Sequence, residues 1–501
     1  RMRPLAEEVL AGLRRDEIRF VPDRWKKVNI DWLENVKDWN ISRQLWWGHQ
    51  IPAWYCQDCG QISVPPLERY LEDPKVCQAC GSPNLKRDED VFDTWFSSAL
   101  WPLSTLGWPE RTEDLEAFYP GDVLVTGYDI LFLWVSRMEV SGYHFLGEKP
   151  FKTVLLHGLV LDEKGQKMSK SKGNVVDPLD LIEKYGADAL RFALIHLATG
   201  GQDIRLDLRW LEMGRNFSNK LYNAARFVLL AREGFRPEKD TPTLADRWME
   251  SRLAQGIERI TGDYEALDLA QAARDVYGLI WGEFCDWYIE AAKPALKEGN
   301  AHTLRTLERV LGELLKLLHP IMPFLTSELY QALTGKEELA LEAWPTPGVP
   351  DPEAEAAFQV VMDAITGVRA LRAELGLPPT QALEVYVEGP GAEEVLRERA
   401  LLESMARATP RLGRPEKALA QVFPRVTVHL VLEGLLDVSE WKKRQEKRLK
   451  ELEALVEKGQ KKLQSPAFRE KAPLEVVQME EERLRENLAQ MERIRENLSR
   501  V

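Results

Sequence analysis

Four cysteines form the densest group of potential ligands in the chain. They stand as two C-x-x-C pairs separated by seventeen residues, and a glycine follows each pair: Cys56, Cys59, Cys77 and Cys80. This spacing is typical of a zinc ribbon, in which both pairs turn their sulfurs toward one metal ion. Four thiolates fill a tetrahedral site, so the zinc would be structural. Reduced thiols without a metal are the alternative, and the fifth cysteine, Cys285, is expected in a hydrophobic core.

A lysine-rich segment, DEKGQKMSKSKGN at residues 162–174, is the second candidate for chemistry. It places Lys164, Lys167, Lys170 and Lys172 within nine residues, with a glycine near each end. Glycines allow a loop to move, and lysines bind phosphate oxygens. The segment is therefore suited to gripping a polyanion, and a solvated loop is the alternative.

The flanking elements indicate where this loop lies. Before residue 206, short apolar runs alternate with helical segments, as in a parallel α/β sheet. GDVLVTGYD (121–129) and FKTVLLHGLVLD (151–162) are predicted strands, with a predicted helix between them. Ligands bind beyond the carboxyl ends of such strands, so Gly127 and Asp129 are expected at a pocket. Asp129 could accept hydrogen bonds from a ribose or an ammonium group, or it could cap the helix.

The rest of the chain predicts other architectures. Amphipathic helices broken by Pro or Gly predict a helical bundle from about 207 to 345. Residues 350–436 are mixed, with predicted strands in QALEVYVEG and RVTVHLVLEG. From 438 to 501, apolar residues recur at spacings of three and four on both sides of a Pro-containing segment. This pattern predicts an antiparallel coiled-coil hairpin.

The charge of the hairpin differs from that of the whole chain. The formal net charge is -13, but residues 441–463 hold nine Lys or Arg against four Glu, which gives 9 - 4 = +5. A basic helix on an acidic protein favours a phosphate-binding arm over a merely solvated face. The candidate contacts are Lys442, Lys443, Arg444, Lys447 and Arg448.

Composition limits the class of protein. With 501 residues, 44% hydrophobic and 29% charged, the chain is long enough for several folded domains. It shows neither an apolar run of eighteen residues nor a leader pattern, so no membrane partner is expected. Clustered cysteines favour a metal in a reducing compartment, and a cytoplasmic location is expected. The opening, RMRPLAEEVL, resembles the middle of a protein and suggests a fragment.

Several motifs resemble one family. KMSKS at 167–171 is the signature pentapeptide of the class I aminoacyl-tRNA synthetases, and NISRQLWWGHQIP (40–52) resembles the return from the editing insertion in the valine, isoleucine and leucine enzymes. DVFDTWFSSALWPLSTLGWP (90–109) and VTGYDILFLWVSRM (125–138) resemble the valyl members in particular. The terminal hairpin is also similar to the arm of those members. The resemblance covers essentially the whole chain.

This resemblance implies a multidomain protein of α/β plus α class. The implied domains are the C-terminal half of a Rossmann-type catalytic domain at 1–160 with a zinc ribbon at 54–90, the KMSKS loop and stem-contact region at 161–206, a helical anticodon-binding domain at 207–345, a small α+β domain at 350–436, and a coiled-coil tRNA-binding arm at 438–501.

The implied activity is that of a valine–tRNA ligase. Such an enzyme joins valine to ATP, supplied with Mg, and then transfers the acyl group to the 3' adenosine of tRNA(Val). Lys167 and Lys170 would stabilise charge on the leaving phosphates as a mobile loop closes. The resemblance places ATP against His157, Gly158, Lys167, Met168, Ser169, Lys170 and Ser171.

Other residues acquire substrate roles from the same resemblance. Trp95 and Trp134 would form the walls of a small valine pocket, beside Gly127 and Asp129. In the helical bundle, one helix face with hydrogen-bonding groups and an aromatic ring could read unpaired bases, although such faces are usually just solvated. Its members are Asn216, Lys220, Asn223 and Phe227.

The chain also departs from the family pattern. It holds no H-I-G-H signature and no threonine-rich editing domain. We therefore expect a catalytically incomplete portion that is inactive by itself. A monomer is also expected. Two alternatives remain at this point: a portion of an isoleucyl-tRNA synthetase, and a synthetase-derived tRNA-binding module without catalytic duty.

Overall fold

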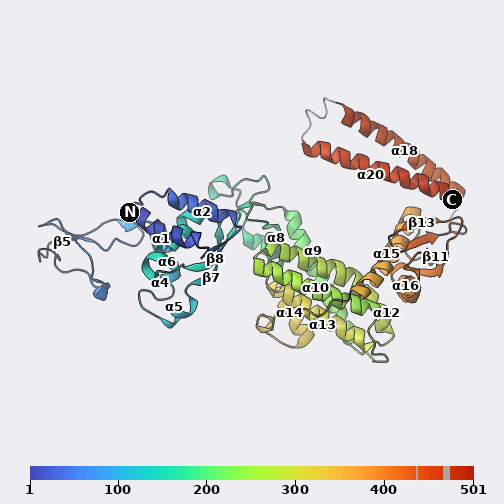
Figure 1. Ribbon diagram of the computed structural model, residues 1–501, viewed down its shortest axis with the longest axis horizontal. Helices are drawn as coiled ribbons and strands as arrows, with labels where there is room; N and C mark the ends of the chain where they lie inside the picture. Colours follow the sequence, from blue (N-terminus) through green and yellow to red (C-terminus); the bar gives the residue numbers. More distant parts are fainter. Residues whose placement is uncertain (436–437, 466–473, 501) are drawn as a thin grey trace. The chain divides into compact units, whose positions relative to one another are not determined.

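The computed structural model describes residues 1–435, 438–465 and 474–500, which fall into two compact units (Figure 1). Unit 1 comprises residues 1–215 and 262–273, and unit 2 comprises the rest. Among the helices described, none combines the length and the apolar character needed to cross a membrane.

A three-stranded parallel sheet lies at the centre of unit 1. Its strands are ordered β1 (Arg19–Val21), β8 (Phe151–His157) and β7 (Gly121–Gly127). From Val123 to Thr126 in β7 the side chains alternate between exposed and buried, because successive residues point to opposite faces of a sheet. Parallel pairing brings the carboxyl ends of β7 and β8 to one edge, where Gly127 lies opposite His157. The predicted parallel sheet is thus confirmed.

Three helices pack on one face of this sheet: α1 (Arg3–Arg14), α2 (Arg24–Glu34) and α6 (Ser136–Leu146). Their apolar side chains meet inward-facing strand residues such as Leu124 and Val154 in a single core. The predicted helix after β7 begins irregularly, as a 3-10 turn, η2 (Tyr128–Ile130), followed by a π-helical turn, η3 (Leu131–Val135).

The cysteine-rich segment is inserted between two short paired strands, β2 (Ser42–Arg43) and β6 (Val91–Phe92). It contains a small antiparallel sheet of order β4-β3-β5. The other unit 1 elements are β3 (Trp54–Cys56), β4 (Ile62–Ser63), η1 (Leu67–Arg69), β5 (Leu85–Arg87), α3 (Thr94–Ser98), α4 (Trp101–Ser104), α5 (Glu113–Phe118), β9 (Val160–Leu161), η4 (Lys170–Lys172), α7 (Pro178–Tyr185), α8 (Ala187–Leu197) and β10 (Ile204–Arg205).

Amphipathic helices make up the first part of unit 2 (Figure 1). In α13, Leu307, Leu311, Leu314 and Leu318 recur at spacings of four, three and four, and all are fully buried, as expected for a helix with one apolar face. The helices from α9 onward are α9 (Leu208–Arg232), α10 (Leu244–Ala266), α11 (Leu269–Tyr277), η5 (Gly278–Tyr288), α12 (Ile289–Lys297), α13 (Ala301–Leu318), α14 (Pro323–Thr334) and η6 (Leu339–Leu341). The predicted helical segment is confirmed.

A small α+β part follows in unit 2. Its long helix α15 (Pro352–Leu375) begins at Asp351, whose side chain accepts a hydrogen bond from the N–H of Ala354, and ends at Gly376 in the left-handed conformation. The four-stranded sheet has the order β12-β11-β14-β13. The elements are β11 (Leu383–Glu388), α16 (Ala392–Arg397), α17 (Arg399–Ala406), β12 (Ala408–Leu412), β13 (Leu419–Val422) and β14 (Thr427–Leu430).

Two long helices, α18 (Val438–Gln464) and α20 (Leu474–Arg500), lie side by side at the end of the chain (Figure 1). Ion pairs join Lys462 to Glu480 and Arg495 to Glu453, so the helices run antiparallel. Their shared core holds Leu452, Val456 and Met491. The predicted hairpin is therefore confirmed, although most of its predicted connecting segment, QSPAFREKAP, lies outside the described residues.

A polar network is buried in the core of unit 1, beneath the irregular start of α6. The Asn29 amide donates to Oε2 of Glu139 at 2.8 Å, and the Ser136 hydroxyl donates to Oδ1 of Asn29 at 2.6 Å. Burial raises the pKa of Glu139 to about 8, although the Asn29 hydrogen bond opposes the shift. Tyr143, the nearby titratable group on the same helix, donates its hydroxyl to Glu17. Glu139 is thus a neutral acid at pH 7.

We predict that Glu139 makes the stability of unit 1 depend on pH. The unfolded pKa is 4.5 and the folded pKa is about 8, so between these values the folded state keeps a proton that the unfolded chain releases. Stability from this group is present below about pH 4.5 and is lost as the pH rises to 8. In Glu139→Gln the loss should disappear, and its unfolding temperature at pH 8.5 should exceed wild type by at least about 3 °C.

The control is Glu116→Gln, which removes an exposed glutamate of α5. Its thermal unfolding curve should follow wild type from pH 5 to pH 9. Parallel pH profiles for wild type and Glu139→Gln would contradict the assignment of Glu139 as a buried neutral acid.

Candidate active site and metal cluster

The carboxyl edge of β7 and β8 gathers five of the residues selected from the sequence: Gly127, Asp129, His157, Gly158 and Lys167. Gly127 ends β7 opposite His157, which ends β8, and Asp129 lies in the 3-10 turn that leaves β7. A Cβ atom at Gly127 would lie only 2.7 Å from Oδ1 of Asp129. Glycine therefore leaves room for the carboxylate to fold back over the strand end.

Gly158 is required by a much closer approach, to backbone atoms. A Cβ atom at this position would overlap the backbone carbonyl of Gln202. The adjacent Asp203 accepts a hydrogen bond from the N–H of Leu159 at 2.8 Å and another from the Tyr128 hydroxyl at 3.2 Å. Asp203 therefore holds the backbone that leaves β8 against the turn that leaves β7. The sequence analysis did not select Asp203. Its one local signal is its position, directly before the short strand β10.

The lysine loop returns to this edge through Lys167. Its ammonium nitrogen lies 3.7 Å from Oδ2 of Asp129, and its side chain is 68% exposed. An exposed ion pair at this distance is weak, because water screens it. Lys167 is therefore held near the strand ends, yet its ammonium group can leave Asp129 and bind a more highly charged anion.

A tight turn built on Asp162 shapes the lysine loop. Oδ1 of Asp162 accepts the N–H groups of Lys164 and Gln166, and Oδ2 accepts the Asn174 amide at 2.9 Å. Hydrogen bonds from Asn174 and from the backbone of Gln166 lower the pKa of Asp162 below its ordinary value. Gly165 completes the turn with a positive φ of 76°. Hydrogen bonds within the loop therefore hold its two ends together at Asp162 and Asn174.

The KMSKS residues divide into anchored and outward positions. Met168 packs against a core formed by α7, α8 and Leu211. The Ser169 N–H donates to Oδ1 of Asn174, and the hydroxyls of Ser169 and Ser171 lie 3.2 Å apart. Lys170 begins the 3-10 turn η4, but its side chain lies outside the described part of the structure.

Two tryptophans selected for a substrate pocket lie on neighbouring elements. Trp95 is in α3 and Trp134 is in η3, which pack against each other, and both side chains are half-buried. The Trp134 indole N–H donates to the carbonyl of Ser98 at the end of α3, at 3.0 Å. Trp134 is thus fixed to the helix that carries Trp95, and its only polar group is already used. A pocket at these rings would select by size and shape.

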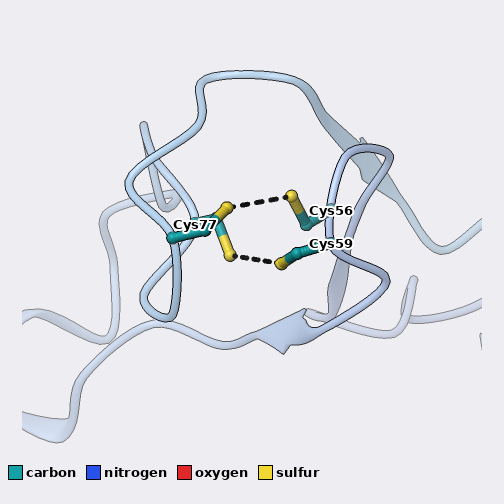
Figure 2. A group of neighbouring side chains, drawn as sticks. Cys56, Cys59 and Cys77 are labelled. Carbon is teal, nitrogen blue, oxygen red and sulfur yellow. Dashed lines mark hydrogen bonds between the residues drawn. The ribbon is translucent and has the colours of Figure 1, made fainter.

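The four cysteines converge from the two C-x-x-C turns, as Figure 2 shows for Cys56, Cys59 and Cys77. The sulfurs of Cys56 and Cys80 are 3.6 Å apart, and so are those of Cys59 and Cys77. Four thiolates around one tetrahedral ion with metal–sulfur bonds of about 2.3 Å would be about 3.8 Å apart, so the cluster fits a metal. Backbone N–H groups of Cys80 and Ala79 lower the pKa of the Cys77 thiol to about 6, whereas, against an opposing backbone hydrogen bond from Gln61, the neighbouring sulfurs and burial raise the pKa of Cys59. Cys285 is buried elsewhere, as expected.

The residues selected for nucleic-acid contact belong to unit 2. On α9, Asn216 and Asn223 are exposed, whereas Lys220 pairs with Asp286 and lies 3.8 Å from the centre of the Trp281 ring. Phe227 is half-buried, with the Lys293 ammonium 5.7 Å from its ring centre. On α18 the basic side chains face solvent, with Lys442 less exposed than the others: Lys443, Arg444, Lys447 and Arg448.

Comparisons with known proteins agree along the whole chain. Residues 1–207 match the family of class I tRNA synthetases for I, L, M and V, residues 246–387 match the anticodon-binding domain of tRNA ligases, and residues 437–501 match the valyl tRNA synthetase tRNA binding arm. A valine–tRNA ligase of Thermus thermophilus is 76% identical over 501 residues, and one of Deinococcus radiodurans is 48% identical over 533 aligned residues. The matches include 100% and 99% of this chain, which spans 58% of the length of either relative.

Solved structures share the fold at lower identity. The methionyl-tRNA synthetase of Mycobacterium tuberculosis, in complex with methionyl-adenylate, superimposes with a TM-score of 0.53 at 20% identity, over 70% of this chain and 67% of that one. The LeuRS of Agrobacterium radiobacter K84, in a ternary complex with tRNA and LeuAMS, gives 0.52 at 23% identity, over 64% and 43%. These likenesses concern the fold alone.

We predict that the cysteine cluster binds one metal ion per chain. Cys77→Ser should reduce the bound metal to near zero, because a serine hydroxyl is a poor replacement for a thiolate in this site. The measurement is elemental analysis of the purified chain after dialysis. Cys285→Ser is the matched control and should retain the metal, and full retention by Cys77→Ser would refute the assignment.

Proposed function

We infer that this chain, which belongs to the valine–tRNA ligase family of class I tRNA synthetases, forms part of an enzyme that activates valine with ATP and transfers it to the 3' adenosine of tRNA(Val). The observation that carries this proposal is the placement of Lys167 beside Asp129 at the carboxyl edge of β7 and β8. The whole-chain matches to valine–tRNA ligases and the match to the valyl arm favour this activity over the isoleucyl alternative.

In this proposal, the negative and positive charges at the strand ends bind different parts of the substrates. Asp129 supplies a carboxylate for the ammonium group of valine or a ribose hydroxyl, and Gly127 leaves room for it. His157 and Gly158 would lie against ATP at the end of β8. Nδ1 of His157 is 2.8 Å from the Gly158 carbonyl oxygen, so Nε2 is the ring nitrogen that His157 would offer. Trp95 and Trp134 supply the apolar walls around the valine side chain.

Lysines of the KMSKS loop would act on the phosphates. When the carboxylate of valine attacks the α-phosphorus of ATP, pyrophosphate leaves and negative charge grows on it. Lys167, only weakly paired with Asp129, can turn toward this charge and stabilise it more in the transition state than in the ground state. Lys170 would do the same, and Mg supplied with ATP would neutralise phosphate charge. Met168 anchors the loop while the lysines move.

The metal in the cysteine cluster is proposed to be zinc with a structural role. Four thiolates leave no open position for a substrate, and the cluster lies in an insertion built from three two- or three-residue strands. Binding energy from the ion would replace the hydrophobic core that so small a sheet lacks.

Transfer RNA is proposed to contact unit 2. The exposed asparagines of α9 and the half-buried Phe227 could meet unpaired bases, while the basic face of α18 could meet phosphates. The pairing of Lys220 with Asp286 makes Lys220 the least available of the four α9 residues.

We predict that Lys167→Ala, in the complete enzyme, lowers kcat for valine-dependent ATP–pyrophosphate exchange by about a hundredfold while changing KM for valine by less than about threefold. This pattern indicates an interaction made in the transition state. Lys164→Ala removes an exposed lysine of the same loop whose contact with Asp162 is through its backbone, and it should remain near wild type. A loss confined to KM would contradict the proposed role.

A second prediction concerns the arm. Removing residues 438–501 should weaken tRNA(Val) binding and flatten the dependence of log Kd on log salt, because fewer phosphate contacts release fewer counterions. Exchange activity without tRNA should stay within about twofold of wild type. Equal salt slopes for the complete and shortened proteins would count against phosphate contacts by the arm.

A further inference from the structure

Asp93 is a buried carboxylate between the cysteine-rich insertion and the tryptophan pair. It is 7% exposed and lies immediately before α3. Its Oδ1 accepts the backbone N–H of Trp95 at 3.1 Å, and its Oδ2 accepts the indole N–H of Trp39 at 3.0 Å. The guanidinium of Arg43 also binds Oδ2. Both oxygens are therefore used, by three residues from two segments of the chain, 39–43 and α3.

The surroundings of Asp93 keep it ionised. Burial by itself would raise the pKa of Asp93, but hydrogen bonds from Trp39 and Trp95 and the charges of Arg43 and Arg137 lower it below its ordinary value. Arg137 comes from α6, and its guanidinium carbon lies 3.4 Å from the centre of the Trp39 ring. The carboxylate is thus enclosed by donors and cations from the insertion base, from α6 and from α3.

Two of these donors come from the base of the insertion. Arg43 is in β2, which pairs with β6, and β6 ends directly before Asp93. The side chain therefore fixes the point where the chain enters and leaves the inserted segment 44–90. Its other oxygen caps α3 through the Trp95 N–H, in the manner of an N-cap aspartate.

Trp95 and Trp134 both depend on where α3 lies. Trp95 is a residue of α3, and Trp134 donates its indole N–H to the carbonyl of Ser98 at the far end of the same helix. A helix of five residues has too few internal hydrogen bonds to hold a position by itself. The groups that fix its ends therefore decide how far apart the two rings stand.

We propose that Asp93 is a positioning residue that sets the width of the amino-acid pocket by fixing α3 and Trp95 to the base of the inserted segment. The inference rests on the proposed function, because it takes Trp95 and Trp134 as pocket walls. It assigns the rejection of an amino acid larger than valine to a side chain that does not touch the substrate.

The test is Asp93→Asn in the complete enzyme. Asparagine can still cap α3 through its oxygen, but its amide nitrogen would face the donors of Trp39 and Arg43, so the attachment to the insertion base is lost. The assay is ATP–pyrophosphate exchange with valine, isoleucine and threonine.

We expect Asp93→Asn to raise KM for valine by about tenfold and to lower the ratio of kcat/KM for valine over isoleucine by about tenfold. An extra methylene is rejected by pocket width, and such rejection is worth about 10- to 200-fold in total. The ratio for valine over threonine should change by less than about twofold, because threonine matches valine in size. General destabilisation would instead lower activity toward all three amino acids together.

Asp90→Asn is the matched control. Asp90 accepts a hydrogen bond from the Gln44 amide across the same base, but no described contact joins it to α3. It should keep wild-type ratios. Metal content and circular dichroism show whether Asp93→Asn folds. If it folds poorly, the second variant is Trp39→Phe, which removes one donor to Asp93 and keeps a ring beneath Arg137. In that variant the ratio of kcat/KM for valine over isoleucine should fall by about threefold.

The outcomes separate the two levels of inference. A wild-type enzyme without valine-dependent exchange would refute the proposed function. An active wild type whose valine-to-isoleucine ratio is unchanged in Asp93→Asn, or in Trp39→Phe where the first variant does not fold, would overturn the role of Asp93 alone. So would an equal loss of the ratio in Asp90→Asn, since the effect would then belong to the insertion base in general.

Discussion

Parallel pairing of β7 with β8 is the constraint on which the candidate active site depends. A register that sets Gly127 opposite His157 brings two chain exits to one edge of the sheet. From one exit the chain enters the turn with Asp129, and from the other it enters the loop with Lys167. These two residues are 38 positions apart in the sequence, yet their charged groups lie 3.7 Å apart. Backbone hydrogen bonds of the sheet, rather than the weak ion pair, hold them in place.

Polar side chains of unit 1 join irregular segments in small, local sets. The exposed Asp203 joins Leu159 to Tyr128, the buried Asp93 joins the insertion base to α3, and the buried Glu139 accepts a hydrogen bond from Asn29 at Oε2. Each set lies where the backbone is irregular: after β8, before α3, and beside the π-helical turn η3. A buried polar group without a partner is costly, so these sets admit few alternative arrangements. They make irregular segments as well defined as the strands, which a site built largely on loops requires.

Charge is likewise arranged locally. The formal charge of the chain is -13, but the first arm helix is basic and the loop beside Asp129 carries four lysines. At physiological ionic strength, interactions between exposed charges are screened beyond about 8 Å, so a phosphate near the arm or the loop responds to the nearby lysines and not to the total. The neighbours of each lysine therefore decide whether it can bind a phosphate. Lys167 is only weakly paired with Asp129 and remains available, whereas Lys220 is neutralised by Asp286.

Sequence alone determined the features that depend on short-range pattern. The C-x-x-C pairs, the short apolar run of β7, the three- and four-residue spacing in α18 and α20 and the lysine loop are local, because such patterns are complete within a few residues. The carboxyl end of a predicted strand supplied Asp129 as a candidate, and family motifs supplied Trp95 and Trp134. Only the tertiary structure decided what these residues contact, because the contacts join segments that the fold brings together. Examples are the ion pair of Lys167 with Asp129 and the hydrogen bond from Trp134 to Ser98. The same holds for the burial of Glu139 and for the partners of Asp93. An aspartate before a short helix signals a cap at Asp93, but no local pattern reveals that Trp39 and Arg43 bind the same carboxylate, since strand pairing at the insertion base decides that distance.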